Sequence, residues 1–242
     1  MMHDASPEEI VRRERELRDR EAPEYDLGRP AWEIEVHKRA VLGLLGLQPG
    51  ETLLDAGAGT GAYVPDYLAA GANVIAVDHS EQSLALAQER VSPADRNRFT
   101  GVVGDLRALA LEDASADRAV CLGVLHHVPT DEFRLQAVRE ILRCLRPGGA
   151  FVAVAYRWLG HVKRHKEGWW SPELYRYAFT VREFDDLLRE AGFTDCSVGG
   201  LIILPGLPER LRLGPERQAA LAFTPVGRLL GQYVFARAVR PS

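Results

Sequence analysis

The sequence has few cysteines, and they suit neither a disulfide framework nor a zinc site. Cys121, Cys144 and Cys196 are odd in number, lie far apart and form no Cys-x-x-Cys pair. We therefore expect reduced, buried thiols and no metal site.

Long apolar runs are also missing. No stretch approaches the roughly 18 to 20 apolar residues that a membrane-spanning helix requires. The N-terminus is polar and crowded with Arg and Glu. These features predict a cytoplasmic enzyme with no membrane partner.

An excess of charge of either sign is absent. The 242 residues carry a formal net charge of −4, so a nucleic-acid partner is not favoured. There is no internal repeat or low-complexity tract, and the hydrophobic content of 46% suits one α/β domain.

Two helical segments precede the first expected strand. Residues 5–24 alternate Glu and Arg with few apolar positions, which predicts a solvated helix that serves as a mobile arm. From Ala31 to Leu47 the pattern turns apolar, so a second helix is expected to pack against the sheet. We divide the chain into an arm over residues 1–30 and a single domain over residues 31–242.

Strand-like runs alternate with helical stretches in that domain. This alternation predicts an α/β, Rossmann-like fold with a mostly parallel sheet and helices on both faces. The expected strands are Thr52–Ala56, Asn73–Asp78, Phe99–Gly104, Arg118–Gly123, Ala150–Ala155, Thr194–Leu204 and Gln232–Val239.

Local signals delimit two of the helices. Thr130 is a candidate N-cap, and Pro147–Gly149 is the expected stop before the fifth strand. Thr180 and Glu183 form a capping-box pattern that opens a helix closing at Gly192. Two insertions are expected, one after strand five and a proline-rich hairpin excursion between the last two strands.

Residues that suit a ligand site begin where the first strand ends. There Asp55 and Ala56 lead into Gly57, Gly59 and Gly61. Glycines let the backbone turn sharply and approach a ligand where a Cβ would intrude. A glycine-rich turn alone is a weak signal, so its neighbours decide the interpretation.

Acidic residues also end the second and third strands. Asp78 can accept from ribose hydroxyls, although an acid followed by His79 could simply begin the next helix. Asp105 can accept from an amino group such as that of adenine, and Leu106 offers its backbone N–H to a ring nitrogen. Three acidic strand ends in succession favour a ligand site over packing.

These motifs resemble the ordered motifs of class I S-adenosylmethionine-dependent methyltransferases. The segments concerned are Leu-Leu-Asp-Ala-Gly-Ala-Gly-Thr-Gly, Val-Asp-His-Ser, Gly-Asp-Leu and Leu-Arg-Pro-Gly-Gly. Within the superfamily, Gly123-Val-Leu-His-His-Val-Pro129 is most similar to the small-molecule branch related to ubiquinone and menaquinone biosynthesis methyltransferases. The resemblance covers about residues 40–195 and implies seven strands, six of them parallel and the last antiparallel.

The resemblance implies S-adenosylmethionine as the cofactor, bound at the carboxyl edge of the sheet. It puts Asp55 and Gly57 near the methionine moiety, Asp78 on the ribose and Asp105 on adenine. The expected cofactor-binding residues are Asp55, Ala56, Gly57, Gly59, Gly61, Asp78, His79, Asp105, Leu106, Leu122 and Gly123.

A dinucleotide-dependent dehydrogenase is the alternative that the glycines leave open. Its usual Gly-x-Gly-x-x-Gly turn holds a pyrophosphate, whereas this loop reads Gly-x-Gly-x-Gly. Asp55, directly before the glycines, would repel a pyrophosphate but suits a sulfonium cation. The sign of that charge favours S-adenosylmethionine.

Two histidines follow the fourth strand, close to the expected methyl group. Methyl transfer depends mainly on alignment, and a general base helps when the acceptor is weakly acidic. His127, preferred over His126, is a candidate base or hydrogen-bond partner of the acceptor, while a structural role in the loop before Pro129 stays open.

The insertion Tyr156–Phe179 combines aromatic and basic residues. They could stack on a planar or anionic acceptor or on single-stranded nucleic acid, or form an amphipathic cap. They are Trp158, His161, His165, Trp169, Trp170, Tyr175, Tyr177, Arg157, Lys163, Arg164 and Lys166. Tyr25, Arg29 and Trp32 could close over the same edge as part of a lid.

The preferred function is methyl transfer to a small-molecule acceptor at oxygen, carbon or nitrogen. The alternatives are a non-catalytic protein that senses S-adenosylmethionine and an RNA or protein methyltransferase. No Asn-Pro-Pro-Tyr-like sequence follows the fourth strand, so methylation of DNA amino groups is not indicated.

Overall fold

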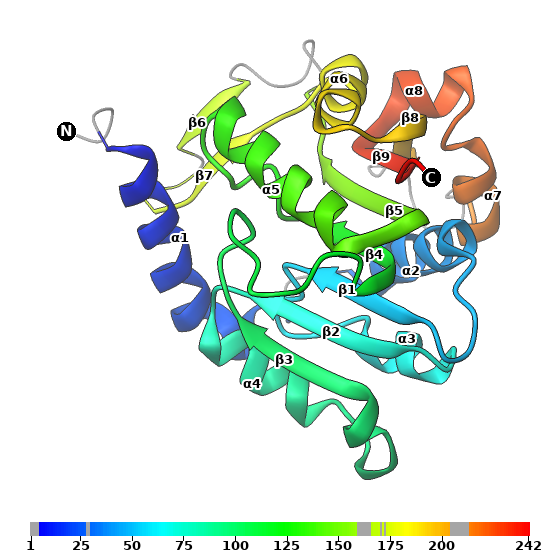
Figure 1. Cartoon of the computed structure of the whole chain (residues 1–242). Coiled ribbons are helices and arrows are strands. Elements are labelled where there is room, and N and C mark those ends of the chain that lie inside the picture. The colour runs from blue at the N-terminus through cyan, green and yellow to red at the C-terminus, as the bar shows by residue number, and fades with distance from the viewer. Residues whose placement is uncertain (1–4, 28–29, 159–165, 170, 172, 204–212) are drawn as a thin grey trace.

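A seven-stranded sheet runs through the computed structural model, which describes residues 5–27, 30–158, 166–169, 171, 173–203 and 213–242 (Figure 1). Its strands follow the order β3-β2-β1-β4-β5-β9-β8. They are β1 (Thr52–Ala56), β2 (Asn73–Asp78), β3 (Phe99–Val103), β4 (Ala116–Leu122), β5 (Leu145–Tyr156), β8 (Thr194–Ile203) and β9 (Gly231–Val239). A separate ribbon pairs β6 (Glu167–Trp169) with β7 (Tyr175–Tyr177).

The direction of the strands agrees with the expectation from the sequence. From β3 to β5 neighbouring strands pair in parallel, whereas β9 pairs antiparallel with both β5 and β8. Six strands of the sheet therefore run one way, and β9, the last in the chain, is reversed. The α/β, Rossmann-like fold of a class I methyltransferase is confirmed.

Helices cover both faces of the sheet, because alternate side chains of each strand point to opposite sides. In β1, Leu54 packs in the core beneath α5 and α6, and Leu53 packs in the core beneath α2, α3 and α4. The α-helices are α1 (Pro7–Glu21), α2 (Ala31–Leu45), α3 (Val64–Ala69), α4 (Glu81–Glu89), α5 (Asp131–Cys144), α6 (Val181–Ala191), α7 (Pro215–Leu221) and α8 (Pro225–Leu230).

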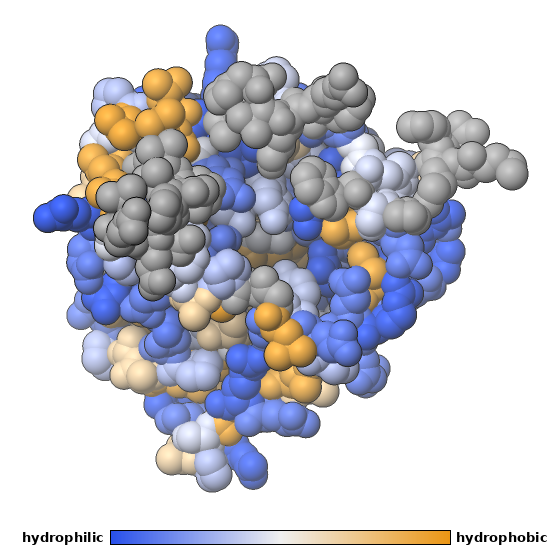
Figure 2. All heavy atoms as spheres, turned by 180° about the vertical axis from the view of Figure 1, so that it is seen from behind, coloured by the Kyte–Doolittle hydropathy of each residue, from blue (hydrophilic) through white to orange (hydrophobic). Residues whose placement is uncertain are grey.

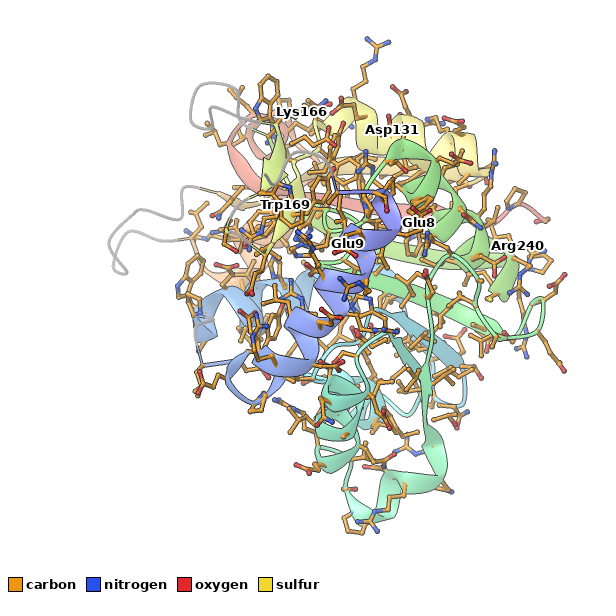
Figure 3. All side chains as sticks on the ribbon, turned by 90° about the vertical axis from the view of Figure 1, so that its left-hand side faces the viewer. Glu8, Glu9, Asp131, Lys166, Trp169 and Arg240 are labelled. Carbon is orange, nitrogen blue, oxygen red and sulfur yellow. The ribbon has the colours of Figure 1, made fainter. Side chains whose placement is uncertain are left out.

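The expectation that the first helix is solvated all round is wrong. Its outer side carries the predicted pairs, with Glu9 bound to Arg12 and Arg13. Its inner side buries Glu14 and Leu17 against the rest of the chain. Figure 3 shows α1 running along the molecule with Glu8 and Glu9 labelled near its start. The alternation of acidic and basic residues gave no sign that one face of this helix is packed.

The stop expected for the fifth helix is also in the wrong position. Helix α5 begins after its N-cap Thr130, as predicted, but it ends at Cys144. Strand β5 starts directly at Leu145. Its first residues, which include Pro147–Gly149, are irregular, and the register of β5 against β4 shifts there. A Cβ on Gly149 would lie 2.8 Å from the carbonyl oxygen of Arg146, so the glycine serves close strand packing.

The excursion between the last two strands contains helices rather than an extended hairpin. Pro215 and Pro225 each begin a short helix, a position where a missing N–H costs nothing. Pro205 and Pro208 lie outside the described residues. The capping box of Thr180 and Glu183 is present at the start of α6.

Hydrophilic side chains cover most of the face seen in Figure 2, and apolar ones form smaller groups. Within the described part of the chain, no helix has the length and apolar character needed to cross a bilayer. The same residues contain no group of three or more His, Cys, Asp or Glu side chains that could hold a metal ion.

We predict that Gly61→Ala destabilises the fold. Gly61 has φ of +73°, and a Cβ there would lie 2.6 Å from Cβ of Ala87 on α4. Overpacking of this kind costs about 1–3 kcal/mol, and the left-handed backbone adds to the cost. Urea denaturation measures the loss.

Gly43→Ala in α2 is the matched control. A Cβ at Gly43 meets nothing within 4 Å, so the helix gains up to about 1 kcal/mol from alanine. Equal unfolding free energies for the two variants would contradict the packing role of Gly61.

Candidate functional site

The glycine loop turns sharply where β1 ends. The backbone N–H groups of Gly57 and Ala58 donate to the carbonyl oxygen of Val77 at 2.7 and 3.0 Å. Gly57, Gly59 and Gly61 all have positive φ. A Cβ on Gly57 would overlap the side chain of Val124, so only glycine fits the turn.

Asp78 at the end of β2 is bound to this loop. Its Oδ2 accepts from the backbone N–H of Gly59 at 2.8 Å, and its Oδ1 accepts from that of Ser80 at 2.9 Å. Both proposed roles of an acid at this position are thus compatible: the carboxylate supports the start of α4 and lies beside the glycine turn.

Asp55 at the end of β1 is almost completely buried, with 3% of its surface exposed. Burial, with repulsion from Asp78 as a second cause, raises the pKa of its carboxyl to about 7. A cation beside Asp55 would favour the ionised form. The end of β1 therefore suits a positively charged group.

Asp105, after β3, is held by Arg107. The guanidinium donates from Nη2 to Oδ2 at 2.6 Å, and the backbone N–H of Arg107 donates to Oδ1 at 2.8 Å. Burial opposes ionisation of Asp105, but the hydrogen bonds from Arg107 prevail and lower its pKa. The sequence prediction did not include Arg107.

The three strand ends surround a first cavity. Nine of the residues expected to bind the cofactor line it: Asp55, Gly57, Gly59, Asp78, His79, Asp105, Leu106, Leu122 and Gly123. Ala56 does not line it and is fully buried in the sheet. Gly61 does not line it either and faces α4 instead.

The N-terminal segment forms another wall of this cavity. Val11, Glu14 and Arg18 of α1 and Tyr25 after it are lining residues. Glu14 accepts from Arg18, with Nη2 and Oε1 2.6 Å apart, while its Oε2 is buried without a hydrogen-bond partner. Burial raises the pKa of Glu14. The sequence pointed to Tyr25 as part of a lid. It did not point to Glu14 or Arg18.

Two aspartates hold the N-terminal segment to the carboxyl edge of the sheet. Oδ1 of Asp19 accepts from Oγ of Ser80 at 2.7 Å. Oδ2 of Asp26 accepts from Oγ1 of Thr60 at 2.7 Å. Because Ser80 follows Asp78 and Thr60 belongs to the glycine loop, the segment is fixed to the walls of the cavity.

A second cavity of about 470 Å³ adjoins the first. Its wall includes aromatic rings from β5, β9 and α2, and two guanidinium groups. The residues common to both cavities are Arg18, Tyr25, Tyr63, Leu122, Gly123 and His127. A molecule in one cavity therefore lies next to a molecule in the other.

His127 lies where the two cavities meet. Its Nδ1 is 3.0 Å from the carbonyl oxygen of Tyr175, and its Nε2 is 3.2 Å from Nη2 of Arg18. A carbonyl only accepts and a guanidinium only donates, so Nδ1 carries the proton and Nε2 accepts. Burial, reinforced by Arg18, lowers the pKa of His127 well below its usual value. The ring is neutral.

His126 lines only the second cavity and is 2% exposed. Its Nδ1 accepts from the backbone N–H of Tyr156 at 3.3 Å, and its ring packs edge-on against that of Tyr156. These contacts fit the structural role that the sequence left open.

Most of the described residues of the aromatic and basic insertion pack inside the protein. Tyr175 and Tyr177 belong to the core, and Arg157 binds the carbonyl oxygens of Gly227 and Gly231. The residue of β7 that lines the second cavity is Arg176, which the sequence did not single out. The expected residues Arg29, His161, Lys163, Arg164, His165 and Trp170 lie outside the described residues.

Of the remaining expected residues, Trp169 and Lys166 lie at the β6–β7 ribbon, Trp158 follows β5 and donates its backbone N–H to the carbonyl oxygen of Phe179, and Trp32 lies on α2. Trp169 has Arg13 of α1 over its ring at 5.7 Å, and Lys166 pairs with Glu183 of α6; both Trp169 and Lys166 are labelled in Figure 3. Trp32 packs against the core beneath α2. The ribbon thus joins α1 to the body of the protein.

Comparison with known proteins gives a family for this architecture. Residues 54–153 match the model of a methyltransferase domain. A ubiquinone/menaquinone biosynthesis C-methyltransferase of Rubrivivax gelatinosus is 30% identical over 182 residues, which are 71% of this chain and 66% of that protein. A tRNA (carboxymethyluridine(34)-5-O)-methyltransferase of mouse is 32% identical over 124 residues, 50% of this chain and 16% of that protein. The chain thus spans less than two thirds of these relatives.

Solved structures share the fold over nearly the whole chain. The 1,6-didemethyltoxoflavin-N1-methyltransferase of Burkholderia thailandensis, solved with 1,6-didemethyltoxoflavin and S-adenosylhomocysteine, superposes with a TM-score of 0.64 at 24% identity. The match covers 98% of this chain and 92% of that one. Residues 54–153 thus match a methyltransferase domain, the fold is that of the class I, S-adenosylmethionine-dependent methyltransferases, and the chain is similar to the ubiquinone and menaquinone biosynthesis methyltransferases.

Proposed function

We propose that this chain binds S-adenosylmethionine in the first cavity and transfers its methyl group to a small-molecule acceptor in the second. The observation that carries the proposal is the pair of adjoining cavities with His127 between them. The bound cofactor supplies an electrophilic methyl group on a sulfonium ion. The protein's own residues orient the two molecules and exclude water from between them.

The first cavity suits this cofactor in shape and charge. A Cβ at Gly57 would overlap the side chain of Val124, so the glycine lets the loop turn tightly beside the cavity. Asp55 and Asp78 line this cavity, and we assign them to the positive amino and sulfonium groups and, for Asp78, to the ribose hydroxyls. His79, Asp105 and Leu106 form the part of the wall that we assign to adenine.

We assign His127 as the residue that accepts the acceptor's proton or a hydrogen bond from it. Its Nε2 lone pair points at Arg18, which lines both cavities. An acceptor hydroxyl that takes the place of the Arg18 N–H meets a neutral imidazole ready to accept. The segment over residues 5–27 acts as the lid, because α1 and Tyr25 wall both cavities.

Methylation of RNA is a second candidate, favoured by the mouse tRNA methyltransferase among the relatives. The net charge of −4 and the burial of Tyr175, Tyr177 and Phe179 argue against an extended RNA surface. The small-molecule reaction is therefore preferred.

Transfer of a labelled methyl group tests the function. The protein is incubated with S-[methyl-³H]adenosylmethionine and, separately, with a small-metabolite extract and an RNA extract. We expect label in the metabolite fraction together with an equal amount of S-adenosylhomocysteine, and Asp78→Asn abolishes both. Label in RNA would establish the second candidate, and tight cofactor binding without any transfer would indicate a sensor.

We predict that affinity for S-adenosylmethionine rises with pH up to about 7 and then levels off. The raised pKa of Asp55, about 7, means that the carboxyl must lose a proton before it can attract the sulfonium. Below that pH the affinity falls by up to about tenfold per pH unit. Calorimetric titration from pH 5.5 to 8.5 measures the dependence, and Asp55→Asn flattens it. A flat profile in the unaltered protein would refute this role of Asp55.

We predict that His127→Ala lowers the rate of methyl transfer by about 10²-fold or more, the usual contribution of a general base. At saturating S-adenosylmethionine, the neutral ring predicts that activity persists well below pH 6.5, since burial lowers the pKa of His127. His127→Gln separates the two roles, because the amide accepts a hydrogen bond but takes no proton. Unchanged rates in both variants, with the identified acceptor, would leave His127 a structural residue.

A further inference from the structure

A hydrogen-bond donor and an acceptor face each other where the two cavities meet. Nη2 of Arg18 on α1 lies 3.2 Å from Nε2 of His127, and both residues line both cavities. Because Nδ1 of His127 donates to the carbonyl oxygen of Tyr175, Nε2 is the acceptor and Arg18 the donor. A hydroxyl group is complementary to such a pair, since its oxygen accepts one hydrogen bond while its hydrogen donates another.

Arg18 is held at this junction by Glu14, which precedes it by one turn of the same helix. Oε1 of Glu14 accepts from Nε of Arg18 at 2.8 Å and lies 2.6 Å from Nη2. Glu14 is 5% exposed, so this ion pair lies inside the protein. Since Nε is bound as well, the guanidinium can tilt without leaving Glu14. An oxygen that binds both Nη2 and Nε2 at ordinary distances requires these atoms to be about 4.5 Å apart, so a tilt of about 1.5 Å admits a hydroxyl.

The charges around His127 favour a hydroxyl over an ammonium group. The charged or titratable groups near its ring come from α1, from β7 and from the loops after β2 and β4; they are Glu14, Arg18, Arg176, His79 and His126. An ammonium group has no lone pair to accept from Arg18 and would be repelled by its charge. A hydroxyl meets neither penalty, and the guanidinium would stabilise the negative charge that develops on its oxygen.

We propose that Arg18 is a second catalytic residue and that the acceptor is an alcohol or a phenol, whose O–H group lies between Arg18 and His127. This proposal rests on the proposed function, because it takes the second cavity as the acceptor site. The hydroxyl proton goes to Nε2 of His127. The oxygen uses the electron pair of the broken O–H bond for its bond to the methyl carbon, and the electrons of the broken carbon–sulfur bond stay on sulfur. The N-terminal helix thus supplies the cation that accompanies the base.

A coloured phenol tests this arrangement without knowledge of the natural acceptor. 4-Nitrophenol absorbs visible light only as the phenolate, so absorbance over a pH series gives the acid dissociation constant of the bound molecule. The protein is saturated with S-adenosylhomocysteine. We expect this constant to exceed that of free 4-nitrophenol about tenfold or more, the effect of an adjacent cation. 4-Nitroanisole, which lacks the hydroxyl hydrogen, binds about tenfold more weakly than 4-nitrophenol.

Substitutions on α1 then assign the effect to Arg18. Loss of one member of a buried ion pair leaves an uncompensated charge, so the informative variant is Glu14→Gln/Arg18→Gln, which removes both. In it the acid dissociation constant of the bound phenol lies within about threefold of the free value. Arg18→Lys keeps the charge and retains part of the effect. Arg12→Gln is the matched control on the same helix and leaves the effect unchanged, because Arg12 lines neither cavity and its side chain is 51% exposed.

The outcomes separate this proposal from the proposed function. Failure of the unaltered protein to bind S-adenosylhomocysteine would refute the proposed function. Where that ligand binds, the proposal is overturned by 4-nitrophenol that does not bind, that binds no better than 4-nitroanisole, or whose acidity is unchanged on binding. Raised acidity that survives in Glu14→Gln/Arg18→Gln overturns it as well. Should this double variant lose cooperative thermal unfolding, Arg18→Lys decides: acidity lower than in Arg12→Gln supports the role of Arg18, and equal acidity refutes it.

Discussion

The site depends on bringing like charges together at the carboxyl edge of a parallel sheet. Because β1 and β2 are adjacent and parallel, the acids that end them, Asp55 and Asp78, lie close together in a buried position. Such a pair costs free energy unless protons, N–H groups or a cation compensate it. Asp78 receives two backbone N–H groups, whereas burial drives Asp55 toward the protonated form. The proposed cofactor is positively charged and would supply the compensation that Asp55 lacks.

The N-terminal helix and the β6–β7 ribbon supply contacts of the site that the sheet alone does not provide. Arg18 of α1 reaches His127, while the carbonyl oxygen of Tyr175 on β7 fixes the proton of His127 on Nδ1. Neither contact involves a residue near His127 in the sequence. The chemical state of the histidine is therefore decided by two distant segments, and any opening of α1 would release the Nε2 lone pair toward the second cavity.

The parts of the fold that could be predicted are those with local causes. The apolar runs of β1 and β2 and the capping box at Thr180 appear within the expected bounds, and the acids at the strand ends follow from the same pattern. The inner face of α1 could not be predicted, because Glu14 and Arg18 have the spacing of an ordinary solvated pair. Both residues contact His127, which lies more than a hundred positions away in the sequence. Arg176 could not be predicted for the same reason. Nothing in the sequence distinguishes this residue of a three-residue strand, and its position in the site depends on its neighbours, which bind the histidines.

The charges around the two cavities bear on the proposed reaction. Acidic residues outnumber basic ones in the wall of the first cavity (Glu14, Asp55, Asp78 and Asp105 against Arg18 and Arg107), and the second is lined by Arg18, Arg176 and Glu33. A methyl group that passes from a sulfonium cation to an acceptor atom that is already deprotonated removes one charge of each sign, whereas a proton that moves to His127 leaves a positive charge on its ring. Charge that disappears in a reaction is stabilised less by water in the transition state than in the reactants, so excluding water lowers the barrier. A lid over both cavities, the role proposed for α1, would therefore act on the rate as well as on binding.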